Sequence, residues 1–289
     1  MSLLEQLDLS ARNQSALSEH MFGVLRSFVY EHTGIYFQDN KRYLLESRVG
    51  RRLQSLGLPD FNAYFDFLSN GGFHREMPQL VNAITINETY FFRNIPQLEA
   101  LETEILPELA RQRDRFVSRP LRIWSAACST GDEAYTMAMM IREKVQPRWP
   151  ELRFELIGTD INSEVIEKAR AGVYGTYAVR NVPPEYMKYF SVEAERFTLR
   201  SDIRNAVSFK ILNLMNRAGM STMRGFDVIV CANVLIYFDG PSKQQVVESL
   251  YNSLAPGGYL LVGFSETLYG VTQAFQPVRF DKTIAYRKE

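Results

Sequence analysis

The stretch WSAACSTGDEAYTMAM, residues 124–139, begins as an apolar run typical of a buried strand and ends with the composition of a helix. Small and acidic residues, Ser129 to Glu133, lie between the two parts. In an open parallel sheet, ligands bind beyond the carboxyl ends of the strands, where each strand turns into the next helix. The stretch therefore predicts a strand-to-helix joint that holds a ligand.

The pattern of the chain changes near Arg119 and indicates two domains. Before that point it is helical, with helices expected at 18–31, 40–56, 60–69, 74–86 and 95–113. After it, short apolar runs alternate with amphipathic helices: strands are expected at 121–128, 152–159, 226–233 and 258–264, and helices at 131–146, 162–171 and 241–254. This order is typical of an α/β fold, a parallel sheet with helices on both faces.

Residues 172–211 interrupt that alternation. They contain a short helix after Pro183-Pro184 and two alternating runs, ERFTLR and AVSFKIL, separated by a turn-like segment at 201–205. We expect a small antiparallel β insertion. The predicted domains are an all-α domain over 1–92, a linker helix over 93–119, and a ligand-binding domain over 120–289 that carries the insertion.

The composition excludes several classes of protein. With 33 basic and 33 acidic residues the net charge is zero, which argues against coating nucleic acid by bulk electrostatics. Three scattered histidines and two cysteines predict no metal site and no disulfide framework. Cys128 and Cys231 end neighbouring strands, so we expect two reduced, buried thiols close together. The start of the chain lacks a signal-peptide pattern and no membrane-spanning run follows, which predicts a cytoplasmic protein.

The acids at the joint limit what it can bind. Asp132 and Glu133 would repel a pyrophosphate, although they could also serve only to cap the helix. Neither a G-x-G-x-x-G fingerprint nor a P-loop is present. Asp160 ends the next strand, where an acid is placed to bind ribose hydroxyls. Two acidic strand tips point to S-adenosylmethionine, which has a ribose, an ammonium and no phosphate.

Several motifs in chain order carry a resemblance to a known family. They are TINETYFFRN (85–94), the 124–139 stretch, GTDIN (158–162), LNL (212–214), CANVLIYF (231–238), LAPGGYLLVGFSE (254–266) and the closing TIAYRK. Together with HTGIYFQDNKRYLLESRVGRRL in the helical domain, they resemble the chemotaxis protein methyltransferases called CheR. The resemblance implies the class I S-adenosylmethionine-dependent methyltransferase fold. It also implies methyl transfer to glutamates of membrane chemoreceptors for sensory adaptation, which yields glutamate methyl esters and S-adenosylhomocysteine.

The resemblance also assigns roles to individual residues. The methionine end of the cofactor and the substrate approach fall to Asn87, Thr89 and Arg93, the ammonium to Glu133, and the ribose to Asp160. Asn213 and Leu214 would flank the adenine, Asn233 would lie near it, and Tyr237 would lie close to the transferred methyl group. The chain departs from the family pattern C-R-N-V at Ala232, so only a backbone contact can remain there.

The chemistry implied by the resemblance needs no general base, because a glutamate with a pKa of about 4.3 is already ionised near neutral pH. Alignment of oxygen, methyl and sulfur is what accelerates the step. Arg93 is the first candidate for that alignment, because a planar guanidinium can hold a carboxylate and leave one oxygen free. Its alternative role is a surface or interdomain ion pair, and Tyr237 alone would more often be a core residue.

The helix expected at 40–56 carries a basic face that is a candidate for the partner surface. Its members are Lys41, Arg48, Arg51 and Arg52. By the resemblance the receptor region is acidic, which favours contact with this face over the alternative of a solvated helix side. The turn of the insertion, SVEAERF, is short, so we expect no binding of a receptor tail. A monomer is expected.

Three other functions compete with this interpretation. An oxidoreductase on the same sheet would need a glycine-rich joint without acids. A catalytically silent adaptor could bind a receptor or nucleotide through the same surfaces, and Ala232 favours it slightly. Methylation of a small molecule or RNA would leave the match of the helical domain to the receptor enzymes unexplained.

Overall fold

The structure, a computed structural model, describes residues 16–112, 116 and 118–289. The start of the chain, and with it the expected absence of a signal peptide, lies outside these residues. The chain forms two compact units that divide between Ile86 and Asn87. We expected the helical domain to reach residue 92. Residues 87–92 instead belong to the second unit, because Phe91 and Phe92 are buried in its core.

The first unit is all-α, as predicted. Its helices are α2 (Glu19–Thr33), α3 (Arg42–Leu56), α4 (Phe61–Phe67) and α5 (Phe73–Ile84), with short turns η1 (Asp39–Lys41) and η2 (Leu68–Gly72). Side chains of Ser18 and Asp60 cap α2 and α4, and Gly34 and Gly57 end α2 and α3 in the left-handed conformation. Leu25, Leu45 and Leu80 are among the buried side chains that join the helices into one core.

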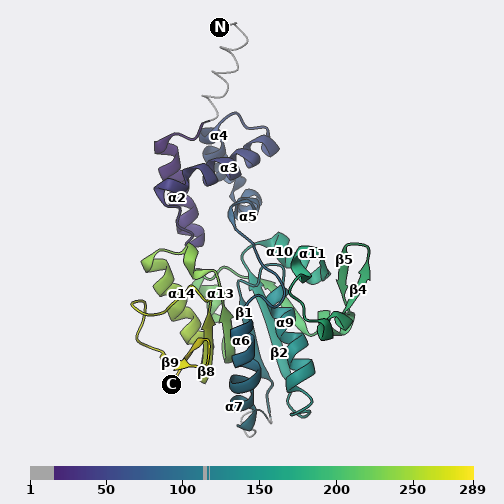
Figure 1. Cartoon of the computed structure of the whole chain (residues 1–289). Coiled ribbons are helices and arrows are strands. Elements are labelled where there is room, and N and C mark those ends of the chain that lie inside the picture. The colour runs from purple at the N-terminus through teal and green to yellow at the C-terminus, as the bar shows by residue number, and fades with distance from the viewer. Residues whose placement is uncertain (1–15, 113–115, 117) are drawn as a thin grey trace, which may run out of the picture. The chain divides into compact units, whose positions relative to one another are not determined.

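The second unit is built on a seven-stranded sheet (Figure 1). Its strands are β1 (Leu121–Ala126), β2 (Phe154–Asp160), β6 (Val207–Ile211), β7 (Phe226–Cys231), β8 (Leu254–Val262), β9 (Gln276–Arg279) and β10 (Ile284–Arg287). The order is β6-β2-β1-β7-β8-β10-β9, with β6 to β8 parallel and β10 antiparallel to both its neighbours. The strand order reverses at β1, so the joint after β1 lies where such sheets bind ligands.

Buried side chains alternate between the two faces of the sheet. On β7, Val228 and Val230 pack into one core, and Ile229 and Cys231 pack into the other. The first core includes residues of α6 (Ile95–Ala100), η3 (Leu101–Ile105), α7 (Leu106–Arg111), α9 (Asp132–Met140), η4 (Ile141–Val145) and α10 (Ser163–Ala171). The second includes α13 (Arg217–Ser221) and α14 (Gly240–Ser253). Helices therefore cover both faces, as the alternating pattern predicted.

The insertion is antiparallel, as predicted, but its hairpin lies elsewhere. A second sheet has the order β3-β5-β4, from β3 (Val173–Tyr174), β4 (Phe190–Glu193) and β5 (Arg196–Leu199), with helical turns α11 (Thr176–Val179) and η5 (Pro184–Tyr189) between β3 and β4. The tight turn joins β4 to β5 at Ala194, whose φ of 54° is left-handed. The segment expected to turn forms helix α12 (Ser201–Arg204), and the run after it becomes β6 of the main sheet. The alternation was correct, but it could not identify the partner of each strand.

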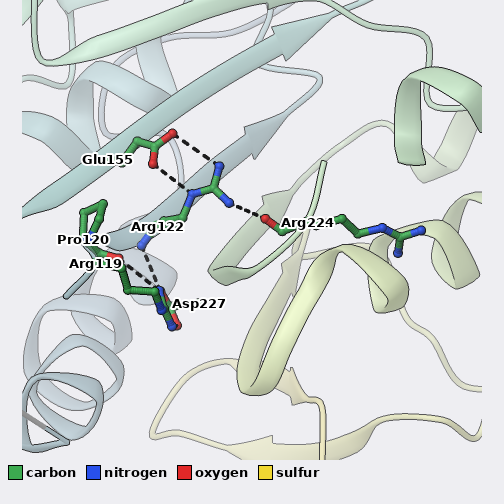
Figure 2. A network of polar contacts seen from close by, with 6 residues as sticks. All are labelled: Arg119, Pro120, Arg122, Glu155, Arg224 and Asp227. Carbon is green, nitrogen blue, oxygen red and sulfur yellow. Dashed lines mark hydrogen bonds and ion pairs between the residues drawn. The ribbon is translucent and has the colours of Figure 1, made fainter. Parts of the chain in front are cut away.

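A polar network fixes the end of the linker to the amino-terminal edge of the sheet (Figure 2). Arg119 forms a bidentate ion pair with the fully buried Asp227, at 2.7 and 2.8 Å. The backbone N–H of Arg122 donates to the same carboxylate, and the Arg122 side chain pairs with Glu155. A buried carboxylate needs such partners, so this network has a structural role.

Among the described residues, no helix has both the length and the apolar character that crossing a membrane requires.

Candidate active site

The joint after β1 is built from backbone that L-residues rarely adopt. Ala127, Ser129 and Gly131 have φ values of 62°, 49° and 85°, and Asn233, after the neighbouring strand β7, has 61°. Strained backbone of this kind clusters at functional sites. A Cβ on Gly131 would lie 3.0 Å from Ala169 and from the Phe209 ring, so this position also requires glycine for space. The strain lies at the edge of the sheet where the ligand site was predicted.

Asp160 closes β2 and is buried beside the joint. Its Oδ2 accepts a hydrogen bond from the backbone N–H of Ser129 at 2.9 Å, and its Oδ1 accepts one from that of Asn162 at 2.9 Å. Burial raises the pKa of Asp160, and these bonds oppose the rise. Each carboxylate oxygen has a second acceptor position. The side chain is therefore fixed in direction by backbone donors, and a carboxylate has enough acceptor positions to bind a hydroxyl group as well.

The two acids that follow Gly131 have different surroundings. Asp132 is fully buried; its Oδ2 accepts from Thr130 Oγ1 at 2.5 Å, whereas Oδ1 has no hydrogen-bond partner among the described residues. Burial raises its pKa to about 6. The helix is preceded by Gly131 and no side chain caps it, so Asp132 contributes to α9 only as a negative charge in its first turn.

Glu133 faces the carboxyl ends of β1 and β7. Its Oε1 accepts a hydrogen bond from Ser125 Oγ at 2.6 Å, the only hydrogen bond of this side chain among the described residues. Burial raises the pKa of Glu133 to about 7; the Ser125 bond and the charge of Arg93 oppose the rise, and the charge of Glu266 adds to it. A bound cation would relieve this burial cost. Glu133 therefore fits an ammonium ligand.

Residues 87–93 lie against the joint. The Asn87 carbonyl accepts from Ser129 Oγ at 3.1 Å, and the Phe92 N–H donates to Thr136 Oγ1 of α9 at 3.2 Å. Arg93 is exposed, and its Nη1 donates to the Glu88 carbonyl at 2.7 Å. Thr89 is half-buried in the same segment. The structure thus brings Asn87 and Arg93 to the same edge of the sheet as Glu133 and Asp160.

The loop after β7 depends on Glu266, a residue to which the sequence assigned no role. Its Oε2 accepts from the backbone N–H groups of Asn233 and Gly263, both at 2.7 Å, and its Oε1 accepts from that of Ile236 at 3.2 Å. This carboxylate holds the left-handed turn at Asn233. The available signal was its position, because Glu266 is an acid four residues beyond a buried strand, as the sequence motif 254–266 shows.

The remaining predicted cofactor residues lie after β6 and β7. Leu214 is buried, and its side chain packs in the second core. Asn213 is half-buried and accepts from the Met215 N–H at 2.9 Å, so its side chain shapes the turn after β6. Ala232 and Tyr237 are half-buried, Tyr237 at the end of η6 (Leu235–Tyr237). All four follow strands at the carboxyl edge of the sheet.

The predicted basic face of the first unit divides in two. Arg52 forms a bidentate ion pair with the buried Glu76, at 2.8 and 2.9 Å, and Tyr64 Oη donates to the same carboxylate. Arg48 donates to the carbonyls of Ile84 and Thr85 at the end of α5. These two arginines hold α3 to α5. Lys41 and Arg51 are exposed and remain available to a partner.

Both cysteines are buried, as expected, and neither forms a disulfide in the structure; Cys128 packs in the first core and Cys231 in the second. Burial raises the pKa of each thiol.

Comparison with known proteins decides the family. Residues 87–284 match the family described as "CheR methyltransferase, SAM binding domain", and residues 20–85 match "CheR methyltransferase, all-alpha domain". The chain belongs to the CheR methyltransferase family. It is an S-adenosylmethionine-dependent methyltransferase with the predicted fold, which excludes the oxidoreductase alternative.

Three curated relatives are similar over nearly their whole length. Chemotaxis protein methyltransferase 2 of Vibrio cholerae is 37% identical over 96% of this chain and 95% of its own. The chemotaxis protein methyltransferase of Escherichia coli K12 is 34% identical, over 92% and 91%. That of Borreliella burgdorferi is also 34% identical, over 85% and 87%. The similarity to these relatives therefore extends over both units of this chain.

The residues present fit S-adenosylmethionine. Glu133 offers a buried carboxylate with one hydrogen-bond partner to the ammonium, and Asp160 offers a fixed carboxylate acceptor to the ribose. Among the described residues at the joint, no lysine or arginine donates to either carboxylate. The joint therefore presents negative charge to its ligand, which suits a cofactor that carries no phosphate.

Proposed function

We propose that this enzyme methylates glutamate side chains of methyl-accepting chemoreceptors in the cytoplasm. The products are a glutamate methyl ester and S-adenosylhomocysteine. The observation that carries the proposal is the pairing of an acidic cofactor edge, Glu133 and Asp160, with an exposed arginine, Arg93, that forms no ion pair among the described residues. The chemoreceptor assignment rests on the names of the relatives, which are chemotaxis protein methyltransferases.

The cofactor, when bound, supplies the electrophilic sulfonium methyl group. In our proposal Glu133 holds its ammonium, Asp160 its ribose, and Asn87 and Thr89 the methionine end. Asn213, Leu214, Ala232 and Asn233 would line the adenine side, with Ala232 contributing backbone only. The Glu266 carboxylate supports this side indirectly, because it fixes the turn at Asn233.

Arg93 is the proposed catalytic residue for the acceptor. Its guanidinium lies over the Tyr90 ring, with Cζ 5.6 Å from the ring centroid, and its Nη1 donates to the Glu88 carbonyl. Its other N–H groups can hold a glutamate carboxylate while one oxygen stays free to attack. The carboxylate needs no base because it is ionised at neutral pH. Tyr237 is proposed to pack beside the transferred methyl and restrict its direction.

The partner surface is proposed to include Lys41 and Arg51, the two exposed members of the predicted basic face. The other two members already bond to α5 and have a structural role. An acidic receptor helix would be attracted to such exposed cations. The enzyme is proposed to act as a monomer.

The test is transfer of radiolabelled methyl groups from S-adenosylmethionine to purified cytoplasmic fragments of chemoreceptors. We expect label on glutamate that is released as methanol by mild base, because methyl esters hydrolyse readily. Arg93→Ala should lower kcat/KM at least a hundredfold, since alignment supplies several kcal/mol; because Arg93 is also assigned to the methionine end of the cofactor, cofactor affinity is measured separately by calorimetry. Cofactor binding without any transfer would overturn the proposal and support the adaptor alternative.

A further inference from the structure

Four side chains beside the joint form a cluster of alternating aromatic rings and cations, which we call the Tyr–Arg cluster: the half-buried Tyr90 and the exposed Arg93, Tyr177 and Arg180. Arg180 Cζ lies 3.6 Å from the ring centroids of both Tyr90 and Tyr177. The two rings are inclined at 79°, so Arg180 lies in the corner between them. Arg93 lies against the same Tyr90 ring. One aromatic ring thus holds two guanidinium groups.

The cluster holds its cations without neutralising them. Arg180 donates to the Tyr177 carbonyl and forms no ion pair among the described residues. Arg180 is exposed, as is Arg93. Contact with a ring face fixes a guanidinium while its in-plane N–H donors remain usable. The guanidinium groups of Arg93 and Arg180 repel each other, and this repulsion decreases when carboxylates bind to them.

The cluster is attached to the catalytic edge at three points. Tyr177 Oη donates to Glu88 Oε1 at 3.0 Å, and the Phe91 N–H donates to the Ala178 carbonyl of α11 at 3.0 Å. The Asn87 carbonyl then bonds to Ser129 in the joint. The charge of Arg180 also lowers the pKa of Asp132. Arg180 therefore has a fixed place near Arg93 although 87 positions separate them in the chain.

We propose that Arg180 binds a second carboxylate of the substrate and so selects target glutamates that have an acidic neighbour. The proposal rests on the proposed function, in which Arg93 holds the reacting glutamate. Arg93 acts on the group that is methylated, and Arg180 acts on a group that is not. A purely structural Arg180, which only joins α11 to residues 87–93, would give no such selectivity.

The first experiment needs no catalysis. Two fluorescent alanine-based helical peptides are titrated with the full-length enzyme and S-adenosylhomocysteine, and anisotropy reports binding. One peptide carries two glutamates one helical turn apart, and in the other the second glutamate is glutamine. The wild type should bind the first peptide about tenfold more tightly, as expected for one charge-assisted contact. Arg180→Gln should abolish this preference, and Arg180→Lys should retain part of it.

Arg148→Gln is the matched control, because Arg148 is an exposed arginine in the turn after η4, at the opposite end of α9 from the joint. It should keep the tenfold preference. An equal preference in the wild type and in Arg180→Gln, or none in the wild type, would overturn the proposal. Affinity for S-adenosylhomocysteine should be unchanged in Arg180→Gln; a loss there together with equal weakening for both peptides would show a structural role.

The second experiment separates this proposal from the proposed function. The same variants are assayed for methyl transfer to a receptor fragment, where Arg180→Gln should raise KM about tenfold with little change in kcat. A wild type that transfers no methyl would overturn the proposed function, whereas the peptide titration would still decide the role of Arg180.

Discussion

At the scale of single residues, the proposed role of Glu133 makes its charge a condition for cofactor binding. The carboxylate is placed where burial disfavours its ionised form, and one hydroxyl group, that of Ser125, is its only hydrogen-bond partner among the described residues. Near neutral pH the Glu133 side chain is therefore only partly ionised until an ammonium group binds. A site formed in this way is destabilising when empty and favourable when filled.

This arrangement predicts that cofactor affinity rises with pH. The pKa of Glu133 is about 7 in the free protein, and a bound ammonium favours the carboxylate, so a proton competes with the ligand below that pH. Affinity for S-adenosylhomocysteine, measured by calorimetry, should fall about tenfold between pH 8 and pH 6. Glu133→Gln should bind weakly with a flat profile. A slope that survives in this variant would assign the titration to another group.

The individual side chains also mark the limit of sequence interpretation. The acids at 132 and 133 are adjacent and chemically alike, yet Asp132 accepts a hydrogen bond from Thr130 and Glu133 accepts one from Ser125 of β1. Residue type and spacing place two carboxylates at the start of the helix, but the direction of each side chain depends on its hydrogen bond, to Thr130 for Asp132 and to Ser125 for Glu133. For the same reason the position of Glu266 after a buried strand did not reveal its role, which it exerts through backbone N–H groups.

At the scale of elements, the site depends on the close approach of two loops at the ends of β7 and β8. Gly263 follows β8, and a Cβ there would lie 2.6 Å from Glu266 Oε2 and 2.8 Å from the Asn233 nitrogen. No side chain fits between these atoms. The loop geometry therefore requires glycine at this position and glutamate at 266.

Gly263→Ala should displace the Glu266 carboxylate and release the turn at Asn233. We expect cofactor affinity to fall at least tenfold, with a loss of roughly 1–3 kcal/mol in the free energy of unfolding, as for other overpacked positions. Gly240→Ala is the matched control, because a Cβ at Gly240 meets nothing within 4 Å. Calorimetry and urea denaturation check both variants. Equal behaviour of the two would contradict this account of the loop.

The order of helices and strands along the chain was largely predictable from the sequence. The pairing of the strands was less predictable. Periodicity located the longer helices of both units and the strands β1, β2, β7 and β8 to within a few residues, and it missed the short helix α13. It failed at 201–212, where a helix and an edge strand were interpreted as a turn and half of a hairpin. Alternation reports that one face of a strand is buried, but it does not specify the neighbouring strand.

At the scale of the whole molecule, the residues assigned to the cofactor all belong to the second unit, and the exposed cations Lys41 and Arg51 belong to the first. Each unit has its own core. Substitutions at the surface of the first unit should therefore change substrate use without changing cofactor affinity.

Arg51→Glu should raise KM for a receptor fragment about three- to tenfold and leave the calorimetric affinity for S-adenosylhomocysteine unchanged, since charges at the rim of an interface act mainly on encounter. Lys41→Glu should add to this effect. Arg75→Glu is the control, because Arg75 is exposed on α5 of the same unit. Arg52 is unsuitable for charge reversal, since this would leave Glu76 buried beside a second acid. An equal effect of Arg51→Glu and Arg75→Glu would indicate unspecific electrostatics.

The two buried cysteines can report local opening of the folded enzyme. Alkylating reagents react with the thiolate, and burial raises the pKa of both thiols and so suppresses the thiolate form. Cys128 lies within the joint, where its N–H donates to the Thr159 carbonyl at 2.8 Å, so a reagent reaches it only when β1 and β2 separate at their tips. Because the chain has only these two thiols, the rate at which iodoacetamide labels Cys128 would time the opening of the cofactor edge, with no engineered probe.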